Sequence, residues 1–214
     1  MSAAEPAGRP EQVGGSAGLD FANTVGPRLP GPGREARDYL PGYPELVGWA
    51  EHVGLLTAGQ RHRLTALAAA DPVGAAAVLG AARRLREAIY QTFAAVARGE
   101  PAPPAALAEI QAAYLSALDS AELGPAPAGL DWCWPERGPL SQVLWPIARA
   151  AVELAVSGRL PRIRQCPGDD GQCGWLFLDT SKNATRRWCS MRTCGSRVKS
   201  RRQAARLRAA RDHH

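Results

Sequence analysis

Four cysteines lie near the end of the sequence and are spaced as two pairs. Six residues separate the first pair, fifteen residues lie between the pairs, and four separate the second pair. Thiolates are soft ligands that suit zinc, and two pairs from separate segments can complete a tetrahedron. The predicted ligands of one Zn²⁺ ion are Cys166, Cys173, Cys189 and Cys194.

The pattern favours a structural zinc ion. Four protein ligands leave the metal no open coordination position, so it has nowhere to bind a substrate. A reducing compartment disfavours disulfides between these thiols, and zinc is expected to supply most of the folding energy of so small and charged a segment. Because no nucleophile–base constellation or phosphate-binding glycine loop is apparent, we expect no enzyme activity. The remaining cysteine, Cys133, is expected to be a buried small hydrophobic residue.

The charge of the chain is distributed unevenly. Residues 159–214 carry a net charge of +10 and residues 1–158 a net charge of −4, which gives the +6 of the whole chain. This asymmetry predicts a polyanionic partner, and arginine can pair with phosphate and read guanine edges. A solvated basic helix that docks on an acidic subunit surface is the alternative. The residues predicted to contact DNA are Arg186, Arg187, Arg192, Arg197, Lys199, Arg201 and Arg202.

The 214 residues predict a mainly α protein with two domains, a helical domain over 1–158 and a small zinc finger over 159–214. Apolar periodicity predicts helices over 44–53, 57–70, 71–99, 103–118 and 140–156. Thr57 and Gln60 are predicted to form a capping box at the start of the second helix, and Pro146 is expected to delay the regular part of the last one to that residue. The proline-rich segments 26–42 and 124–138 are expected to be irregular, with Trp132 and Trp134 of the second tucked back onto the helices.

The finger is expected to resemble a treble clef, with a knuckle, a β-hairpin and a C-terminal helix. A strand over 175–178 is predicted to turn at 179–183 and return over 185–188. Ser190 is predicted to cap a helix that runs from 191 towards 212. Trp175 and Trp188 flank the cysteines and are expected to pack over the metal site, while Asp179 and Asn183 hold the turn.

Composition also bears on where the chain resides. No apolar run approaches the roughly 18 residues of a membrane helix, and the first residues contain no hydrophobic stretch typical of a secretory signal. We therefore expect a soluble cytoplasmic protein, associated with the nucleoid when bound to DNA, and no membrane partner. The frequent Ala, Gly, Pro and Arg residues favour a GC-rich bacterial source.

Three motifs resemble the CGNR zinc-finger family: Cys-Gly-Trp-Leu-Phe-Leu-Asp-Thr-Ser-Lys-Asn over 173–183, Arg-Arg-Trp-Cys-Ser-Met over 186–191 and Cys-Gly-Ser-Arg-Val-Lys over 194–199. Gly-Leu-Asp-Phe-Ala-Asn-Thr-Val over 18–25 and Asp-Tyr-Leu-Pro over 38–41 resemble the ABATE domain that precedes this finger in bacterial proteins. The resemblance implies a stress-induced transcription regulator that binds DNA through the finger. Ser196 replaces the Asn of the family motif, and the first cysteine pair is wider than in the family.

Two polar residues of the N-terminal motif, Asp20 and Asn23, have two interpretations. They could line a pocket for a small-molecule effector, or they could cap the first helix and tie down the proline-rich connection. We favour the second because Asp and Asn so often bond to nearby backbone.

The leading hypothesis is a DNA-binding transcription regulator, and a homodimer fits it because regulators commonly read two half-sites. The alternatives are a protein-interaction or RNA-binding module shaped by zinc, and a zinc-thiolate redox switch, since electropositive surroundings keep thiolates reactive.

Overall fold

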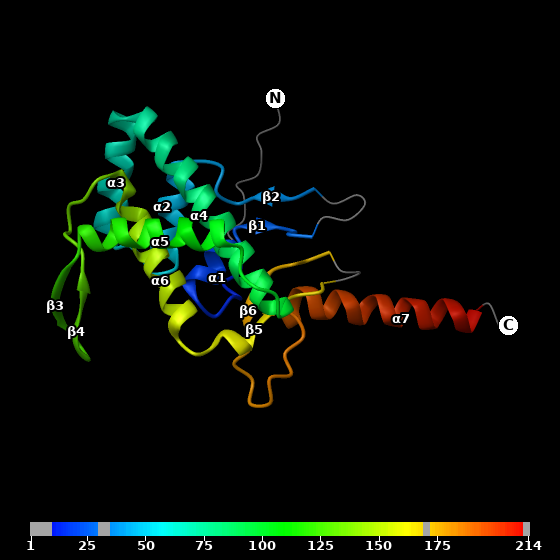
Figure 1. The fold of residues 1–214 in the computed structure, drawn as a ribbon. Helices are drawn as coiled ribbons and strands as arrows, with labels where there is room; N and C mark the ends of the chain where they lie inside the picture. The colour runs from blue at the N-terminus through cyan, green and yellow to red at the C-terminus, as the bar shows by residue number, and fades with distance from the viewer. Residues whose placement is uncertain (1–9, 30–34, 169–171, 212–214) are drawn as a thin grey trace, which may run out of the picture.

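The computed structural model describes residues 10–29, 35–168 and 172–211. A helical body holds most of the chain, a small strand pair flanks the first two cysteines of the C-terminal segment, and the last helix extends away from the body (Figure 1). The expected mainly α class, with a finger at the C-terminal end, is confirmed. The helices are α1 (Ala17–Ala22), α2 (Tyr43–His52), α3 (Ala58–Ala70), α4 (Pro72–Arg98), α5 (Pro104–Asp119), α6 (Trp145–Val156) and α7 (Ser196–Arg211).

The described strands form three separate antiparallel pairs. They are β1 (Val25–Gly26) with β2 (Arg37–Asp38), β3 (Glu122–Ala126) with β4 (Gly129–Cys133), and β5 (Ile163–Gln165) with β6 (Leu176–Leu178). Short helical turns complete the fold: η1 (Leu140–Leu144), η2 (Leu160–Arg162) and the π-type turn η3 (Met191–Gly195).

The longest helix, α4, forms the centre of the body. Asp71 caps its first turn by accepting a hydrogen bond from the Gly74 N–H at 2.8 Å, and Gly99 ends it in the left-handed conformation with φ of 73°. Its buried stripe includes Leu85, Ile89 and Phe93, as the apolar spacing predicts.

Of the other predicted body helices, those over 44–53, 57–70 and 103–118 are present within one residue of their expected ends, and the last, over 140–156, begins five residues late as an α-helix. The capping box of α3 is confirmed, because the side chains of Thr57 and Gln60 each accept from the other's backbone N–H. In the last of these segments the α-helix begins only at Trp145, with Pro146 in its first turn, where a missing N–H costs nothing.

The short helix α1 lies in the core, packed against α4 and α6. A Cβ added at Gly18 would lie 3.2 Å from the backbone of Ala151, so glycine allows the two helices to approach closely. Leu19 and Phe21 are fully buried, and the Phe21 ring lies 5.2 Å from that of Trp49. These contacts therefore fix the N-terminal motif over 18–25 within the core.

Residues 124–138 contain a hairpin that the sequence analysis missed. β3 pairs with β4 with Leu123 opposite Trp132, and both side chains are exposed. The predictions that Trp132 tucks inward and that Cys133 is buried are wrong, because the hairpin projects from the helices and most of its side chains are exposed (Figure 1). An ion pair between Asp131 and Arg149 links it to α6. Trp134 does pack inward, and its indole N–H donates to the carbonyl of Ala117 at 2.7 Å.

The finger hairpin differs from the predicted one. β6 pairs with β5, which precedes the first cysteine, and the described residues 185–188 form no strand. The segment after β6 instead wraps around Asp179, whose carboxylate accepts from the N–H groups of Ser181 and Arg186 at 2.9 and 3.0 Å. These local bonds take the backbone groups that a returning strand would need.

No single helix in the described part of the chain is both long and apolar enough to cross a membrane. The helices α3 and α4, bent by 120° at their junction, reach that length and composition only as a pair.

A buried ion pair fastens the β1–β2 arm to α4. Arg86 donates to both carboxylate oxygens of Asp38 at 2.8 and 2.9 Å, and its side chain is 5% exposed. Burial raises the pKa of Asp38, but hydrogen bonds from Arg86 and from the Leu40 N–H outweigh it, so the net pKa lies below the usual 3.8. The ionised carboxylate therefore stabilises the fold.

Replacing Arg86 with Met should lower the free energy of unfolding at pH 7 by about 2 kcal/mol, because Asp38 loses its bidentate partner in a partly buried position and keeps the longer 3.6 Å ion pair with the exposed Arg83. A lowered pKa stabilises the folded state above the unfolded pKa, and this contribution disappears as the pH falls through the folded pKa. Urea unfolding from pH 7 to pH 3 should show the deficit of R86M shrinking below about pH 4. R84M, which removes an exposed arginine on the same helix, is the control; a deficit that does not change with pH would contradict the assignment.

Candidate metal centre

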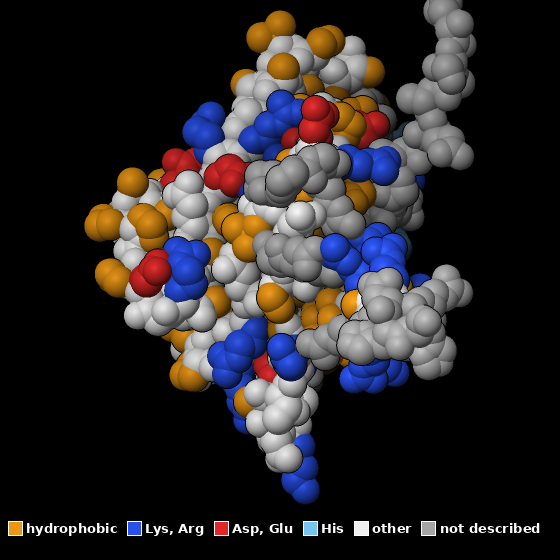
Figure 2. All heavy atoms as spheres, turned by 90° about the vertical axis from the view of Figure 1, so that its right-hand side faces the viewer, with side chains coloured by type: hydrophobic (Ala, Val, Ile, Leu, Met, Phe, Trp, Pro, Cys, Tyr) orange, Lys and Arg blue, Asp and Glu red, His pale blue; other side chains and the backbone are white. Residues whose placement is uncertain are grey.

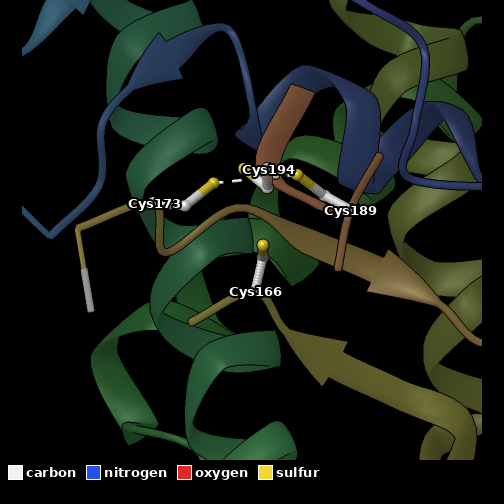
Figure 3. Close-up of side chains that lie close together, drawn as sticks. All are labelled: Cys166, Cys173, Cys189 and Cys194. Atoms are coloured by element: carbon white, nitrogen blue, oxygen red, sulfur yellow. Dashed lines mark hydrogen bonds between the residues drawn. The ribbon is translucent and has the colours of Figure 1, made fainter. Parts of the chain in front are cut away.

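The side chains of the four predicted ligands converge on one point (Figure 3). Their sulfur atoms all lie within 4.8 Å of one another, and the Cys173–Cys189 and Cys189–Cys194 pairs are each separated by 3.7 Å. Zinc binds thiolate sulfur at about 2.3 Å, which places neighbouring sulfurs of a tetrahedron about 3.8 Å apart. The donor set and its spacing therefore fit a single tetrahedral zinc ion.

The first two ligands stand at the end of the β5–β6 hairpin. The ladder continues past the strands, because Cys166 N–H donates to the Trp175 carbonyl at 2.8 Å and Gly174 N–H donates back to the Cys166 carbonyl at 2.9 Å. Gly168 then reverses the chain with φ of +62°, and a Cβ there would lie 2.6 Å from the nitrogen of Cys173. Glycine thus lets the wide first pair close into a knuckle.

The second pair is carried by η3 and the loop before it. Gly195 N–H donates to the Ser190 carbonyl at 3.0 Å, which closes the turn around Cys194. The helical segment begins at Met191 with Ser190 in the N-cap position, as predicted, but within the described residues the Ser190 side chain caps no backbone N–H. The first turn is the π-type η3, which continues into α7 at Ser196. The Ser196 hydroxyl donates to the Arg192 carbonyl at 2.6 Å, so this departure from the family motif is satisfied within its own turn.

The four thiols lie so close together that a bound cation would stabilise them. Cys166 and Cys189 are buried, and Cys173 is only partly exposed. Hydrogen bonds from neighbouring thiols lower the pKa of Cys166, while the same contacts raise the pKa of Cys173 and Cys189. Four thiolates at this distance repel one another, and a divalent ion supplies the missing positive charge. With four protein ligands, the chemistry it supplies is structural.

Apolar side chains surround the cluster. Phe177 is fully buried against it, and Trp175 and Trp188 pack over it as predicted. The Trp175 indole N–H donates to the Val25 carbonyl at 2.8 Å, and a Cβ at Gly26 would lie 2.6 Å from the same nitrogen. The body's β1 strand therefore rests directly on the wall of the metal site.

The motif residue Asn23 joins the body to the finger. Its amide donates to the Leu176 carbonyl at 2.8 Å, and its carbonyl oxygen accepts from the Leu176 N–H at 2.9 Å. The side chain is fully buried, so these bonds exclude water. Asn23 thus pairs with the outer edge of β6 as a neighbouring strand would.

Asp20, the other residue that could line an effector pocket, also forms hydrogen bonds with backbone groups. Its carboxylate accepts from the Gly14 N–H at 2.7 Å, and the Gly14 carbonyl accepts from the Leu178 N–H at 2.8 Å. Burial raises the pKa of Asp20, and the Gly14 and Val13 N–H groups partly offset this shift. Both side chains therefore bond to backbone, as the favoured interpretation expected, but their partners differ from the expected ones: Asp20 holds the N-terminal segment and Asn23 holds β6, and neither bond reaches the proline-rich connection.

Arg186, predicted to contact DNA, is also a structural residue of the finger. Its guanidinium lies 4.4 Å from the Phe177 ring centre and donates to the carbonyls of Val13 and Trp188 at 3.0 Å each. It also donates to the Cys189 carbonyl. These partners belong to the cysteine cluster or lie beside it, so the Nε and one Nη of Arg186 are engaged within the finger; a contact of this residue with DNA stays a prediction.

The other predicted basic residues remain on the surface. Arg187 is exposed beside the Trp188 ring, and Arg192 is 89% exposed with a 3.6 Å ion pair to Glu11. Figure 2, turned so that α7 points towards the viewer, shows Lys and Arg side chains gathered around that helix. The exposed basic residues on α7 are Arg197, Lys199, Arg201, Arg206 and Arg208. Arg202 belongs to the same helix, but its side chain lies outside the described part.

A helical body followed by a cysteine knuckle, a second cysteine turn and a helix defines a protein with a C-terminal zinc finger, which binds one zinc ion. Residues 15–158 match the ABATE family, whose printed description is "putative stress-induced transcription regulator", and residues 162–207 match the CGNR zinc finger. The chain belongs to the ABATE family and carries a CGNR zinc finger. A search of curated proteins finds no match to it.

Purified protein should contain one zinc ion per chain, and C189S should lose it, because three thiolates cannot close the tetrahedron. Native mass spectrometry measures the stoichiometry. The loss should free the finger while most of the helical circular dichroism, which comes from the body, persists. C133S removes an exposed cysteine far from the cluster and is the matched control. Stoichiometric zinc in C189S, or its loss in C133S, would refute the ligand assignment.

Replacing Asn23 with Leu should lower the free energy of unfolding by roughly 2–4 kcal/mol, because a buried N–H and a buried carbonyl of Leu176 lose their partners. It should also speed transfer of zinc to a colorimetric chelator, since β6 loses its neighbour. N183L changes an exposed asparagine of the same finger and should leave both values unchanged. Equal chelator kinetics in the two variants would show that Asn23 does not stabilise the knuckle.

Proposed function

We propose that this chain is a DNA-binding transcription regulator in which the zinc finger presents α7 to a duplex. The observation that carries the proposal is the exposed basic surface of α7, which extends from the body and carries five described basic side chains on the surface. Its net positive charge contrasts with the negative charge of residues 1–158. The family description as a transcription regulator supports the same partner.

The dimensions of α7 support a helix that lies on DNA. At 1.5 Å per residue, its sixteen residues span about 24 Å, and an α-helix fits the major groove of B-DNA. Spacings of four and seven place Arg197, Arg201 and Arg208 on one face. Contacts with phosphate are the proposed main source of affinity, since phosphate contacts position a protein without reading sequence.

The zinc ion and the body have supporting roles in this proposal. Cys194 lies two residues before α7 begins, so the closed metal site fixes the starting direction of the helix. In this role the chain catalyses no reaction. It resides in the cytoplasm and associates with the nucleoid when it binds DNA, and the helical body senses a signal or forms the dimer.

The double variant R197A/R201A should bind duplex DNA at least about tenfold more weakly and lower the salt slope of log K by about 2, one unit for each lost phosphate contact. Fluorescence anisotropy over a series of salt concentrations measures both values. R137A, which removes an exposed arginine from the body, is the control. Zinc content and circular dichroism establish that the fold is intact. An unchanged slope and affinity in a folded double variant would disprove the proposed surface.

Selection from a random duplex pool at about 0.15 M salt distinguishes sequence reading from charge attraction. A single enriched motif would support a regulator, and a two-fold symmetric motif would support a homodimer. Tighter binding to RNA or to a protein partner than to any duplex would favour an interaction module instead.

A further inference from the structure

A cavity of about 310 Å³ lies where the body meets the finger, here called the junction cavity. It is bordered by the N-terminal segment, the β1–β2 arm, the knuckle, η3 and the first turn of α7. Its size falls at the small end of the range of ligand pockets, roughly 300–1,000 Å³. Neither Asp20 nor Asn23 is among its lining residues, so it is separate from the predicted effector site.

One wall of the junction cavity is aromatic and apolar. The rings of Tyr39 and Trp175 meet edge to face with centres 6.4 Å apart, and Pro10 and Pro27 extend this surface. The indole nitrogen of Trp175 is already bonded to Val25, so the ring is held in place. Such a preformed wall suits a flat ring or a branched hydrocarbon side chain.

The lining of the junction cavity also carries one charge of each sign, from Glu11 and Arg197. Three of the four zinc ligands, Cys173, Cys189 and Cys194, form its cysteine wall. Within the described residues Glu11 forms an ion pair with Arg192, whose side chain is 89% exposed, and such a solvated pair is weak. Sulfur atoms of the cysteine wall can also accept N–H groups. A ligand with a single charge would pair with one of these two side chains and leave the other without an opposite charge on the ligand.

We propose that the junction cavity binds a small zwitterion, an α-amino acid with an aromatic side chain. Its carboxylate pairs with Arg197, its ammonium lies towards Glu11, and its ring packs on Tyr39 and Trp175. The guanidinium of Arg197 can hold a carboxylate through two parallel hydrogen bonds.

The consequence for DNA rests on the proposed function. Arg197 belongs both to the cavity wall and to the basic face of α7. A bound carboxylate therefore competes with phosphate for the same guanidinium, and the ligand bridges the β1–β2 arm to the start of α7. Occupancy of the cavity should weaken DNA binding, to the extent that the ligand prefers the DNA-free form.

Calorimetry with the zinc-loaded full chain tests the ligand class with three probes that share one ring: L-phenylalanine, phenylacetate and phenethylamine. L-Phenylalanine should bind with one site per chain, and each singly charged probe should bind at least about tenfold more weakly. Equal or tighter binding of either singly charged probe, or no saturable binding of L-phenylalanine at millimolar concentration, would overturn the proposal.

Two variants assign the charged ends. E11Q should weaken L-phenylalanine and phenethylamine and spare phenylacetate, whereas R197A should weaken L-phenylalanine and phenylacetate and spare phenethylamine. E136Q and R208A remove exposed charges away from the junction cavity and should leave all three affinities unchanged. If E11Q and R197A behave like these controls, the assigned contacts are wrong.

A DNA titration with and without saturating L-phenylalanine separates this inference from the proposed function. Weaker DNA binding with the amino acid, lost in E11Q, supports both. If the chain binds no DNA, the proposed function fails while the calorimetry still decides the ligand site.

Discussion

The buried exchange of hydrogen bonds between Asn23 and Leu176 is the contact on which the rest of the finger depends. Two strands of three residues each are marginal in water, because they bury too little apolar surface. Asn23 supplies the backbone-like partner that the open edge of β6 lacks, and it does so from a helix locked between α4 and α6. The body therefore completes the sheet that holds the metal, and the finger is not an independent module.

The metal and the body constrain different halves of the same small structure. Body contacts position β6 and the knuckle, which carry Cys166 and Cys173, whereas the second cysteine pair lies in a loop and a π-type turn with little core of its own. A metal bond to Cys189 and Cys194 joins that loop to the knuckle. Because α7 follows directly, the direction of the basic helix depends on both constraints together.

The features that the sequence predicts correctly are those that depend on interactions between residues close together in the chain. Apolar periodicity, the capping box at Thr57 and the paired cysteine spacing each act over a few residues, and the structure bears them out. The partner of β6 and the hairpin at 122–133 depend on contacts between distant segments, which periodicity does not encode. Two adjacent arginines also differ only because of contacts with distant segments. Arg186 is held against Phe177 and Arg187 is exposed, although only the fold distinguishes them.

The arrangement at the junction also determines how a body of this kind can influence its finger. α7 continues directly from η3, and η3 shares the junction cavity with the β1–β2 arm, which Arg86 fastens to the central helix through Asp38. A short chain of contacts, through the arm and the cysteine turn, therefore joins the body to α7. If the chain binds DNA as proposed, only a ligand that binds the DNA-free and DNA-bound forms unequally can change its affinity for DNA. Because Arg197 of α7 lines the junction cavity, a ligand bound there would contact the basic surface directly, without rearrangement of the core.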